Sequence, residues 1–268
     1  MNRRVSLTRR VRRVTVAIAT VGAMLTMTGG MIILSGSPAS AASCTSVSTS
    51  KGTLTAAVVN TNVSGTVTLT GCDIGVYFGP NVTGTVSNAV ISDFIEYGVF
   101  NDGGSVTVTD STISNIGDSP FDGMQYGVGV YFNSPNGSTA TGTISGNTIT
   151  NYQKGGITVN GIGSNAIVTG NKVLGVNQVP YIAQNGIQFG FGAAGSVSGN
   201  TIDGNWYTGA GWTSTGLLLF DVNASQVKTS HNLLRNNQTE FALIESNACS
   251  SMYDGFYGGY DLCPVAVS

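Results

Sequence analysis

The sequence predicts an all-β solenoid, in which short strands wind into stacked coils, and three observations support this prediction. A Gly-Asn-x-apolar pattern recurs at residues 146–149, 170–173 and 199–202. Gly, Ser, Thr and Asn are abundant and only 9% of residues are charged, which favours short strands and tight turns over helices. A short strand beginning near a glycine recurs about every thirty residues, a period typical of solenoids, at residues 97–99, 126–128, 155–157, 185–187 and 215–217.

The first 41 residues are predicted to be a secretory signal peptide. Six arginines between residues 3 and 13 precede a mostly apolar stretch at 14–34, and Ala39-Ser40-Ala41 is a typical cleavage site. An uncleaved membrane anchor is the alternative, because the apolar stretch is just long enough to span a bilayer. We expect residues 42–268 to form the secreted, extracellular domain, with no membrane attachment after cleavage.

The charge of the mature chain argues against nucleic acid as a partner. The leader carries six of the eleven basic residues and none of the thirteen acidic ones, so the mature net charge is −8. Arg235 is then the only arginine. Nucleic-acid binding requires a basic surface to neutralise phosphates. We expect an extracellular polysaccharide or surface glycan as partner instead, and a monomeric protein.

Coils are predicted over about residues 52–246, each with a strand, a sharp Asn turn, a second strand, a variable loop and the Gly-initiated strand. Alternating polar and apolar residues mark strands at 66–70, 106–109 and 195–198. Ser111 takes the turn position in an earlier coil, with Ala89 and Cys72 as weaker equivalents. Apolar side chains two residues after the turn should face inward: Ile113, Ile149, Val173, Ile202 and Leu234.

This repeat resembles the single-stranded, right-handed parallel β-helix of the pectin-lyase-like superfamily, whose coils stack asparagines at one tight turn. The resemblance covers about residues 52–246. It implies an Asn ladder in which each buried amide bonds the next, formed by Asn147, Asn171, Asn200 and Asn232. His231, the sole histidine, precedes one of these asparagines, and we interpret it as structural rather than catalytic.

All four cysteines lie in the mature chain, where export permits disulfides. Sequence alone allows three pairings. Cys44 with Cys72 and Cys249 with Cys263 would each fasten one end of the domain. Residues 247–268 are rich in aromatic side chains and are expected to cap the solenoid, with a sugar-stacking platform as the alternative.

Loop lengths indicate where a binding groove would lie. In the superfamily that the chain resembles, the variable loop precedes the strand that lines the groove. The loops at 115–125, 175–184 and 205–214 are long, whereas 151–154 is short, so Lys154 is expected on the floor of a saddle. Equivalent positions just before the groove strand should form a column: Glu96, Gln125, Lys154, Gln184 and Ser214.

A polysaccharide lyase must neutralise a uronate carboxylate and place a base beside the proton that leaves. Glu96, Asp118 and Asp122 are the candidate oxygen ligands for Ca²⁺, the one cofactor expected. Lys154 is the candidate base and Tyr126 or Tyr131 the acid, with Asp122 also counted among the catalytic candidates. The alternative is that these are ordinary polar residues where a solvated loop meets a strand.

A glycoside hydrolase needs two carboxylates instead. Asp221 and Glu245, on successive coils, are the candidate pair, although acids at such places are often turn formers. Side chains expected to contact a sugar are those with amide groups or aromatic rings near the groove: Gln125, Gln188, Tyr131, Trp206 and Trp212.

Specific enzyme families of this superfamily match poorly. Pectate lyases rely on arginine-containing motifs, polygalacturonases on an Asp-Asp pair and a His-containing motif, and alginate epimerases on DPHD, all of which the sequence lacks. Two hypotheses therefore stay open. One is a secreted lyase or glycosidase acting on an extracellular polysaccharide, and the other is a non-catalytic module that binds a glycan or a cell surface.

Overall fold

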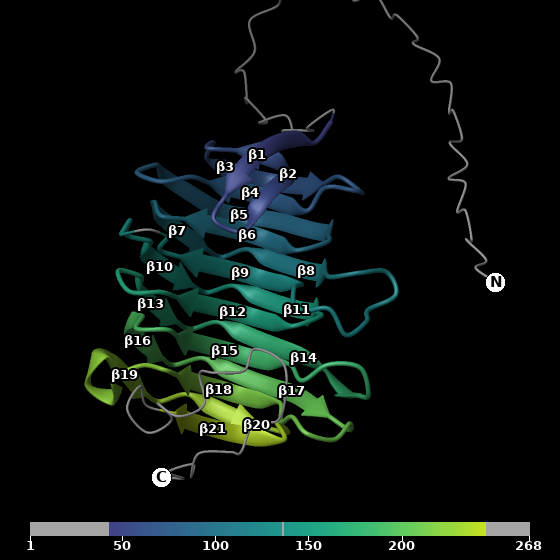
Figure 1. Cartoon of the computed structure of the whole chain (residues 1–268), viewed down its shortest axis with the longest axis vertical. Coiled ribbons are helices and arrows are strands. Elements are labelled where there is room, and N and C mark those ends of the chain that lie inside the picture. Colours follow the sequence, from purple (N-terminus) through teal and green to yellow (C-terminus); the bar gives the residue numbers. More distant parts are fainter. Residues whose placement is uncertain (1–42, 136, 245–268) are drawn as a thin grey trace, which may run out of the picture. The chain divides into compact units, whose positions relative to one another are not determined.

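The structure is a computed structural model that describes residues 43–135 and 137–244. Here the chain winds into stacked coils of parallel strands, as the repeat predicts (Figure 1). Each coil from β6 onwards contributes one strand to each of three sheet faces, which we name A, B and C in chain order. The prediction of an all-β parallel β-helix is confirmed.

Face A contains the Gly-initiated strands, and its pairing is parallel from β2 onwards. An antiparallel strand, β1 (Thr45–Thr49), pairs with β2 and begins the sheet. The parallel strands are β2 (Gly52–Val59), β4 (Ile74–Phe78), β6 (Tyr97–Asp102), β9 (Val128–Asn133), β12 (Gly155–Asn160), β15 (Asn185–Gly190), β18 (Thr215–Phe220) and β21 (Thr239–Ile244).

Faces B and C are joined through the long strand β5 (Thr83–Phe94), whose first half pairs with face B and second half with face C. Strand β3 (Val63–Thr68) pairs along both halves. Face B continues through β7 (Ser105–Thr109), β10 (Thr141–Ser145), β13 (Asn165–Thr169), β16 (Ala194–Ser198) and β19 (Val227–Ser230), which follows a short 3₁₀ helix at Ala224–Gln226. Face C continues through β8 (Thr112–Ile116), β11 (Thr148–Tyr152), β14 (Lys172–Val179), β17 (Thr201–Tyr207) and β20 (Leu233–Arg235).

The Asn ladder forms at the sharp turn between faces B and C, as predicted. The side-chain amide of Asn147 donates to Oδ1 of Asn171, Asn171 donates to Asn200, and Asn200 donates to Asn232, each at 2.9 Å. The ladder extends backwards through Ser111, whose backbone N–H donates to Asn147 and whose hydroxyl accepts from the N–H of Ala89. The ladder thus hydrogen-bonds the tight turn of each coil to the next.

The residue before each ladder position explains the Gly-Asn motif. It has a positive φ, between 49° and 66°, in every coil from Asn88 to His231. This left-handed conformation favours Gly, Asn and Asp, which is why Gly146, Gly170 and Gly199 occur here. His231 serves as a turn residue at this corner, with its side chain exposed.

The predicted equivalence of Cys72 to the ladder positions is wrong. Gly65 pairs with Ala89 and takes that place, whereas Cys72 lies just before β4, where its carbonyl accepts from Ile95. There it forms a disulfide with Cys44, with the Cα atoms 5.6 Å apart. The first predicted disulfide is confirmed. Cys249, Cys263, Glu245 and the cap at 247–268 lie outside the described residues.

The interior is filled by inward-facing apolar side chains stacked coil on coil. The predicted inward residues Ile113, Ile149, Val173 and Ile202 are fully buried, and Leu234 packs against the same cluster. Glycines at the second position of the face A strands allow close packing: a Cβ on Gly129 would lie 2.6 Å from Ile149 and 2.7 Å from the carbonyl of Gly156.

We expect that Asn171→Ala destabilises the protein by about 1–3 kcal/mol, because the N–H groups of Asn147 and the carbonyl of Ile144 lose their buried partner. Urea unfolding followed by circular dichroism measures this. Asn165→Ala is the matched control, since Asn165 is exposed on the same coil. Equal stability losses in the two variants would contradict a supporting role for the ladder.

Candidate functional site

The predicted site residues separate to opposite ends of face A. Glu96 and Lys154 lie where the chain enters face A, along what we call the loop edge: the connections from face C to face A, which include residues 117–127, 180–184 and 208–214. Asp221 follows β18 at the other end, with φ 54° and its N–H bonded to the carbonyl of Ile244. A six-residue strand spans roughly 17–20 Å. Asp221 and Lys154 therefore cannot act on the same bond.

The predicted column is correct at four of its five positions. Backbone pairing aligns Tyr97 with Val128, Val128 with Gly155, Gly155 with Asn185 and Asn185 with Thr215, so the residues just before them stack. These are Glu96, Gly127, Lys154, Gln184 and Ser214. Gln125 was predicted where Gly127 lies, because the alternating sequence from Tyr126 to Val130 permits a slip of two residues without changing which side chains face inward.

A buried glutamine organises the longest loop. Gln153 accepts hydrogen bonds from the backbone N–H groups of Asp118 (3.0 Å) and Asp122 (3.2 Å). Its amide donates to Oδ1 of Asp122 (3.2 Å) and to the carbonyl of Met124 (3.0 Å). Gln153 was not predicted, because its partners precede it by 29 to 35 residues and only the folded loop brings them together.

The loop brings the predicted acidic residues close to one another. Burial, and then the charges of Asp73 and Asp118, raise the pKa of Glu96. Burial, a hydrogen bond with Asp118, and the charges of Asp118, Asp122 and Glu96 raise the pKa of Tyr126 to about 12. Tyr126 therefore stays protonated at neutral pH and can act as a proton donor.

This cluster does not fit Ca²⁺ as it stands. The described part of the chain contains no group of three or more His, Cys, Asp or Glu side chains placed to hold a metal ion. Oδ1 of Asp122 already accepts from the N–H of Met124 (2.8 Å) and from Gln153. Ca²⁺ requires six to eight oxygen ligands, whereas Asp122 as arranged uses its carboxylate to fix the loop.

Lys154 is half-buried rather than raised on an open saddle. Its Nζ donates to the carbonyl of Ala183 at 2.9 Å. Burial lowers the pKa of its amine to about 8. The loop at 117–127 reaches the next one, since a Cβ on Gly123 would lie 3.1 Å from the carbonyl oxygen of Tyr181. The loops that contain Gly123 and Tyr181 thus approach each other across the coil of Lys154, so the gap between them is narrower than the expected saddle.

Two of the loops, predicted at 175–184 and 205–214, are shorter than predicted. Residues 175–179 and 205–207 continue β14 and β17, and after a register shift they pair Asn177 with Asn205 and Gln178 with Trp206. A second, buried ladder begins at this corner: Asn205 donates to Oδ1 of Asn237 (2.8 Å) and accepts from the hydroxyl of Tyr152 (2.6 Å).

The outer side of face A is covered over its first coils by the β1–β2 hairpin. The hairpin turn is fixed by Ser50, whose N–H donates to Asp102 (2.7 Å) and whose hydroxyl accepts from Asn133 (2.9 Å). Tyr131 is only 5% exposed and stacks on Tyr97 at 5.1 Å between ring centroids. As folded, Tyr131 is therefore unavailable to a ligand.

Gln188 and Trp212, which were also predicted to contact a sugar, lie on other parts of the surface. Gln188, on the outer side of face A, accepts from Asn185 and donates to Asn160, both at 3.1 Å. Trp212 is 48% exposed in the connection at 208–214.

Trp206 lines a shallow groove beside the loop edge. The groove is bordered by Asn177, Gln178 and Asn236, all exposed, and Trp206 itself is 36% exposed. Gln178 and Trp206 belong to the ends of β14 and β17 that continue past the residue paired with Arg235, the last residue of β20.

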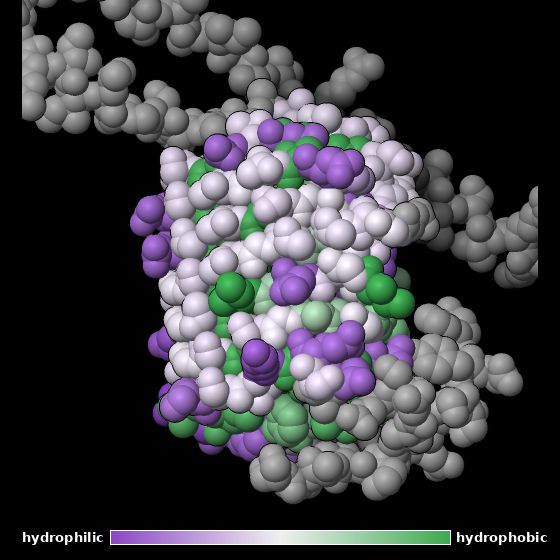
Figure 2. Space-filling view, turned by 90° about the vertical axis from the view of Figure 1, so that its left-hand side faces the viewer, coloured by the Kyte–Doolittle hydropathy of each residue, from purple (hydrophilic) through white to green (hydrophobic). Residues whose placement is uncertain are grey.

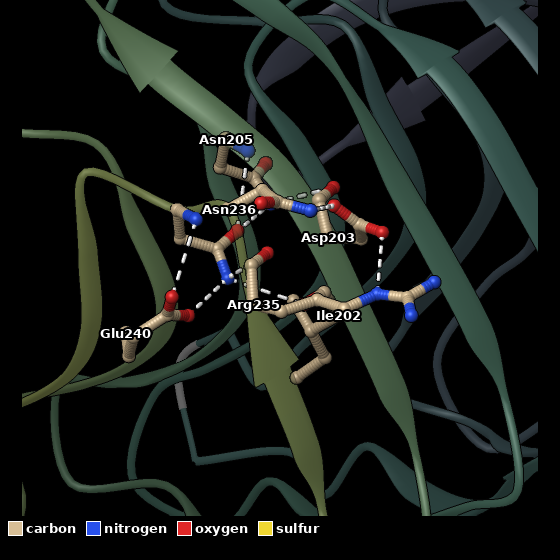
Figure 3. Close-up of polar contacts among 7 residues, drawn as sticks. Ile202, Asp203, Asn205, Arg235, Asn236 and Glu240 are labelled. Atoms are coloured by element: carbon tan, nitrogen blue, oxygen red, sulfur yellow. Dashed lines mark hydrogen bonds and ion pairs between the residues drawn. The ribbon is translucent and has the colours of Figure 1, made fainter.

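One of the bordering amides, that of Asn236, is oriented by a carboxylate that also forms an ion pair (Figure 3). Arg235 donates to Oδ2 of Asp203 at 2.8 Å, and the amide of Asn236 donates to Oδ1 of the same carboxylate at 3.0 Å. Behind them, Asn237 donates to Glu240 at 2.6 Å. The amide groups of Asn177, Gln178 and Asn236 offer hydrogen bonds, and the indole of Trp206 offers a stacking surface. A sugar ring can use both kinds of contact.

Residues 56–256 match the protein family described as right handed beta helix region. No curated protein and no solved structure matches the chain. In the described residues, no helix has the length and apolar character needed to cross a membrane.

Replacing Gln153 should loosen the loop without unfolding the coils. In Gln153→Ala, the N–H groups of Asp118 and Asp122 lose their acceptor, and we expect amide hydrogen exchange at residues 117–126 to accelerate at least tenfold. Gln125→Ala, in the same loop, is the control, because Gln125 bonds only locally, to Gly123. Unchanged exchange in Gln153→Ala would show that the loop is fixed by other contacts.

Proposed function

The chain belongs to the right-handed β-helix family, and on this basis we propose that it is a secreted protein of the pectin-lyase-like superfamily that binds an extracellular polysaccharide. Secretion is supported by the basic and apolar leader with its Ala-Ser-Ala site and by the Cys44–Cys72 disulfide. The observation that carries the proposal is the groove at Trp206 with its three bordering amides.

The groove suits a sugar better than a charged ligand. Asn177, Gln178 and Asn236 each offer a carbonyl acceptor and an N–H₂ donor, which matches hydroxyl groups that both donate and accept. The carboxylate of Asp203, which bonds Asn236, is neutralised by Arg235. We therefore infer a neutral sugar unit, stacked on Trp206 and bonded at its rim.

We expect Trp206→Ala to weaken polysaccharide binding roughly two- to tenfold, the effect of losing one aromatic stacking contact. Affinity electrophoresis through gels containing neutral or uronate-rich polysaccharides measures this. Leu233→Ala is the matched control, since Leu233 is an exposed apolar residue of face C outside the groove. A wild-type protein that no polysaccharide in the panel retards would contradict the proposal.

An enzymatic role, as a lyase or glycosidase, is the second candidate, and the lowered pKa of Lys154 favours it. Perturbed amines of this kind are typical of general bases. In this scheme Lys154 releases the carbonyl of Ala183, takes a proton from the sugar, and Tyr126 protonates the departing oxygen. Asp118 and Asp122 hold the loop that carries Tyr126.

If Lys154 is a base, turnover should rise between pH 7 and pH 9, because the neutral amine becomes populated as pH passes about 8. Lys154→Arg should abolish turnover, since a guanidinium does not deprotonate, whereas Lys172→Arg, on exposed face C, should not change it. The assay is product release from uronate-rich and neutral polysaccharides, with and without Ca²⁺. Absence of unsaturated or shortened products throughout would exclude the enzyme while leaving the binding proposal intact.

A further inference from the structure

Face B carries a regular array of hydroxyl groups. Its strands alternate buried apolar residues with outward-facing polar ones, and the register aligns the outward residues coil by coil. One column consists only of hydroxyl residues in every described coil: Ser87, Thr109, Ser145, Thr169, Ser198 and Ser230. A neighbouring column begins with Thr85, Thr107 and Thr143.

The array extends in two dimensions. A third column starts with Thr83, Ser105 and Thr141. Parallel strands place equivalent residues about 4.8 Å apart across the sheet, and alternate residues lie about 6.6 Å apart along a strand. Over β5, β7, β10 and β13, only Asn165 and Ile167 interrupt the hydroxyl residues.

The positions of these groups are fixed by the fold. Each strand from β7 to β16 is paired on both sides, and the Asn ladder holds the end of face B in register. Threonine side chains have few rotamers because they branch at Cβ. Neighbouring hydroxyls also interact, as Ser198 donates to Thr169 at 3.3 Å.

Face B is almost uncharged. Among the described strand residues of this face, with β5 counted from Thr83 to Ser87, Lys228 is the one charged residue and no aromatic residue occurs. The side of the molecule on which Figure 1 labels these strands shows mainly residues of near-neutral hydropathy, with scattered hydrophilic and hydrophobic ones (Figure 2). Face C differs, since it carries Lys172, Asp203 and Arg235 at outward positions.

A flat, periodic, uncharged surface suits a ligand that is itself flat and periodic. Small molecules bind in concave sites with a few converging groups, and sugar surfaces are usually met by aromatic rings, which face B lacks over the described residues. Hydroxyls donate and accept as water does, and fixed hydroxyls hold bridging waters at little entropic cost. We propose that face B binds the ordered water of an ice surface, and so restrains the growth of ice crystals.

This activity is independent of the polysaccharide groove, which is lined by residues of the face C strands β14 and β17 and by Asn236. The test is to freeze a dilute solution of the full secreted chain slowly and measure the fraction of protein that enters the ice. We expect wild-type protein to be enriched in the ice at least fivefold over an inert protein of similar size. The double variant Thr107→Lys with Thr143→Lys, neighbours in one column, should fall to the level of the inert protein.

The matched control is Thr112→Lys with Thr148→Lys, neighbours in one column of face C in the same two coils. It should be enriched like wild type. Thermal unfolding establishes whether each variant is folded. If the face B double variant is not folded, the single variant Thr143→Lys replaces it.

Exclusion of wild-type protein from ice, or enrichment of the face B variant, would overturn the proposal. A third outcome would also overturn it: wild-type protein binds crystalline cellulose or chitin, the face B variant does not, and both proteins are excluded from ice. Face B would then be a polysaccharide-binding surface. Loss of polysaccharide binding in Trp206→Ala leaves the ice measurement unaffected, so the two proposals fail separately.

Discussion

The stack of buried amides at the turn between faces B and C is the interaction on which the rest of the structure depends. A single buried asparagine without partners would cost about 1–3 kcal/mol. From Asn147 to Asn200, each amide instead donates to the next coil while its Oδ1 accepts from the previous one. The ladder can form only if the coils stack in register, and the apolar interior can close only under the same condition. One constraint therefore fixes both the packing and the alignment of the surface residues.

Alignment is what gives this protein its candidate surfaces. Because every coil repeats the same corners, side chains at one corner form columns and those on one face form arrays. The groove at Trp206 appears where this regularity is interrupted, at the ends of β14 and β17 that follow a register shift. The hydroxyl array of face B appears where the regularity is greatest. The candidate groove therefore depends on a departure from the repeat, whereas the hydroxyl array depends on the repeat itself.

The fold could be predicted from sequence because its signals are local and repeated. The glycines before Asn147, Asn171 and Asn200 are favoured by a positive φ, and the apolar residue two places after the ladder asparagine is required by the interior. The loops were less predictable, since their lengths depend on contacts between coils. Gln153 is held by partners 29 or more residues away, and β14 continues to Val179 only because β17 pairs with it. The two-residue slip at Gln125 came from a sequence that suits either register.

Native-state amide hydrogen exchange at the ladder tests the central claim most directly. The backbone N–H groups of Asn147, Asn171 and Asn200 each donate to the amide oxygen of the following ladder residue, at 3.0, 2.9 and 3.0 Å. If the ladder holds the coils in register, these three protons should exchange only through global unfolding, with the same free energy and the same dependence on denaturant. Exchange through local opening, at a free energy well below that of unfolding, would contradict it.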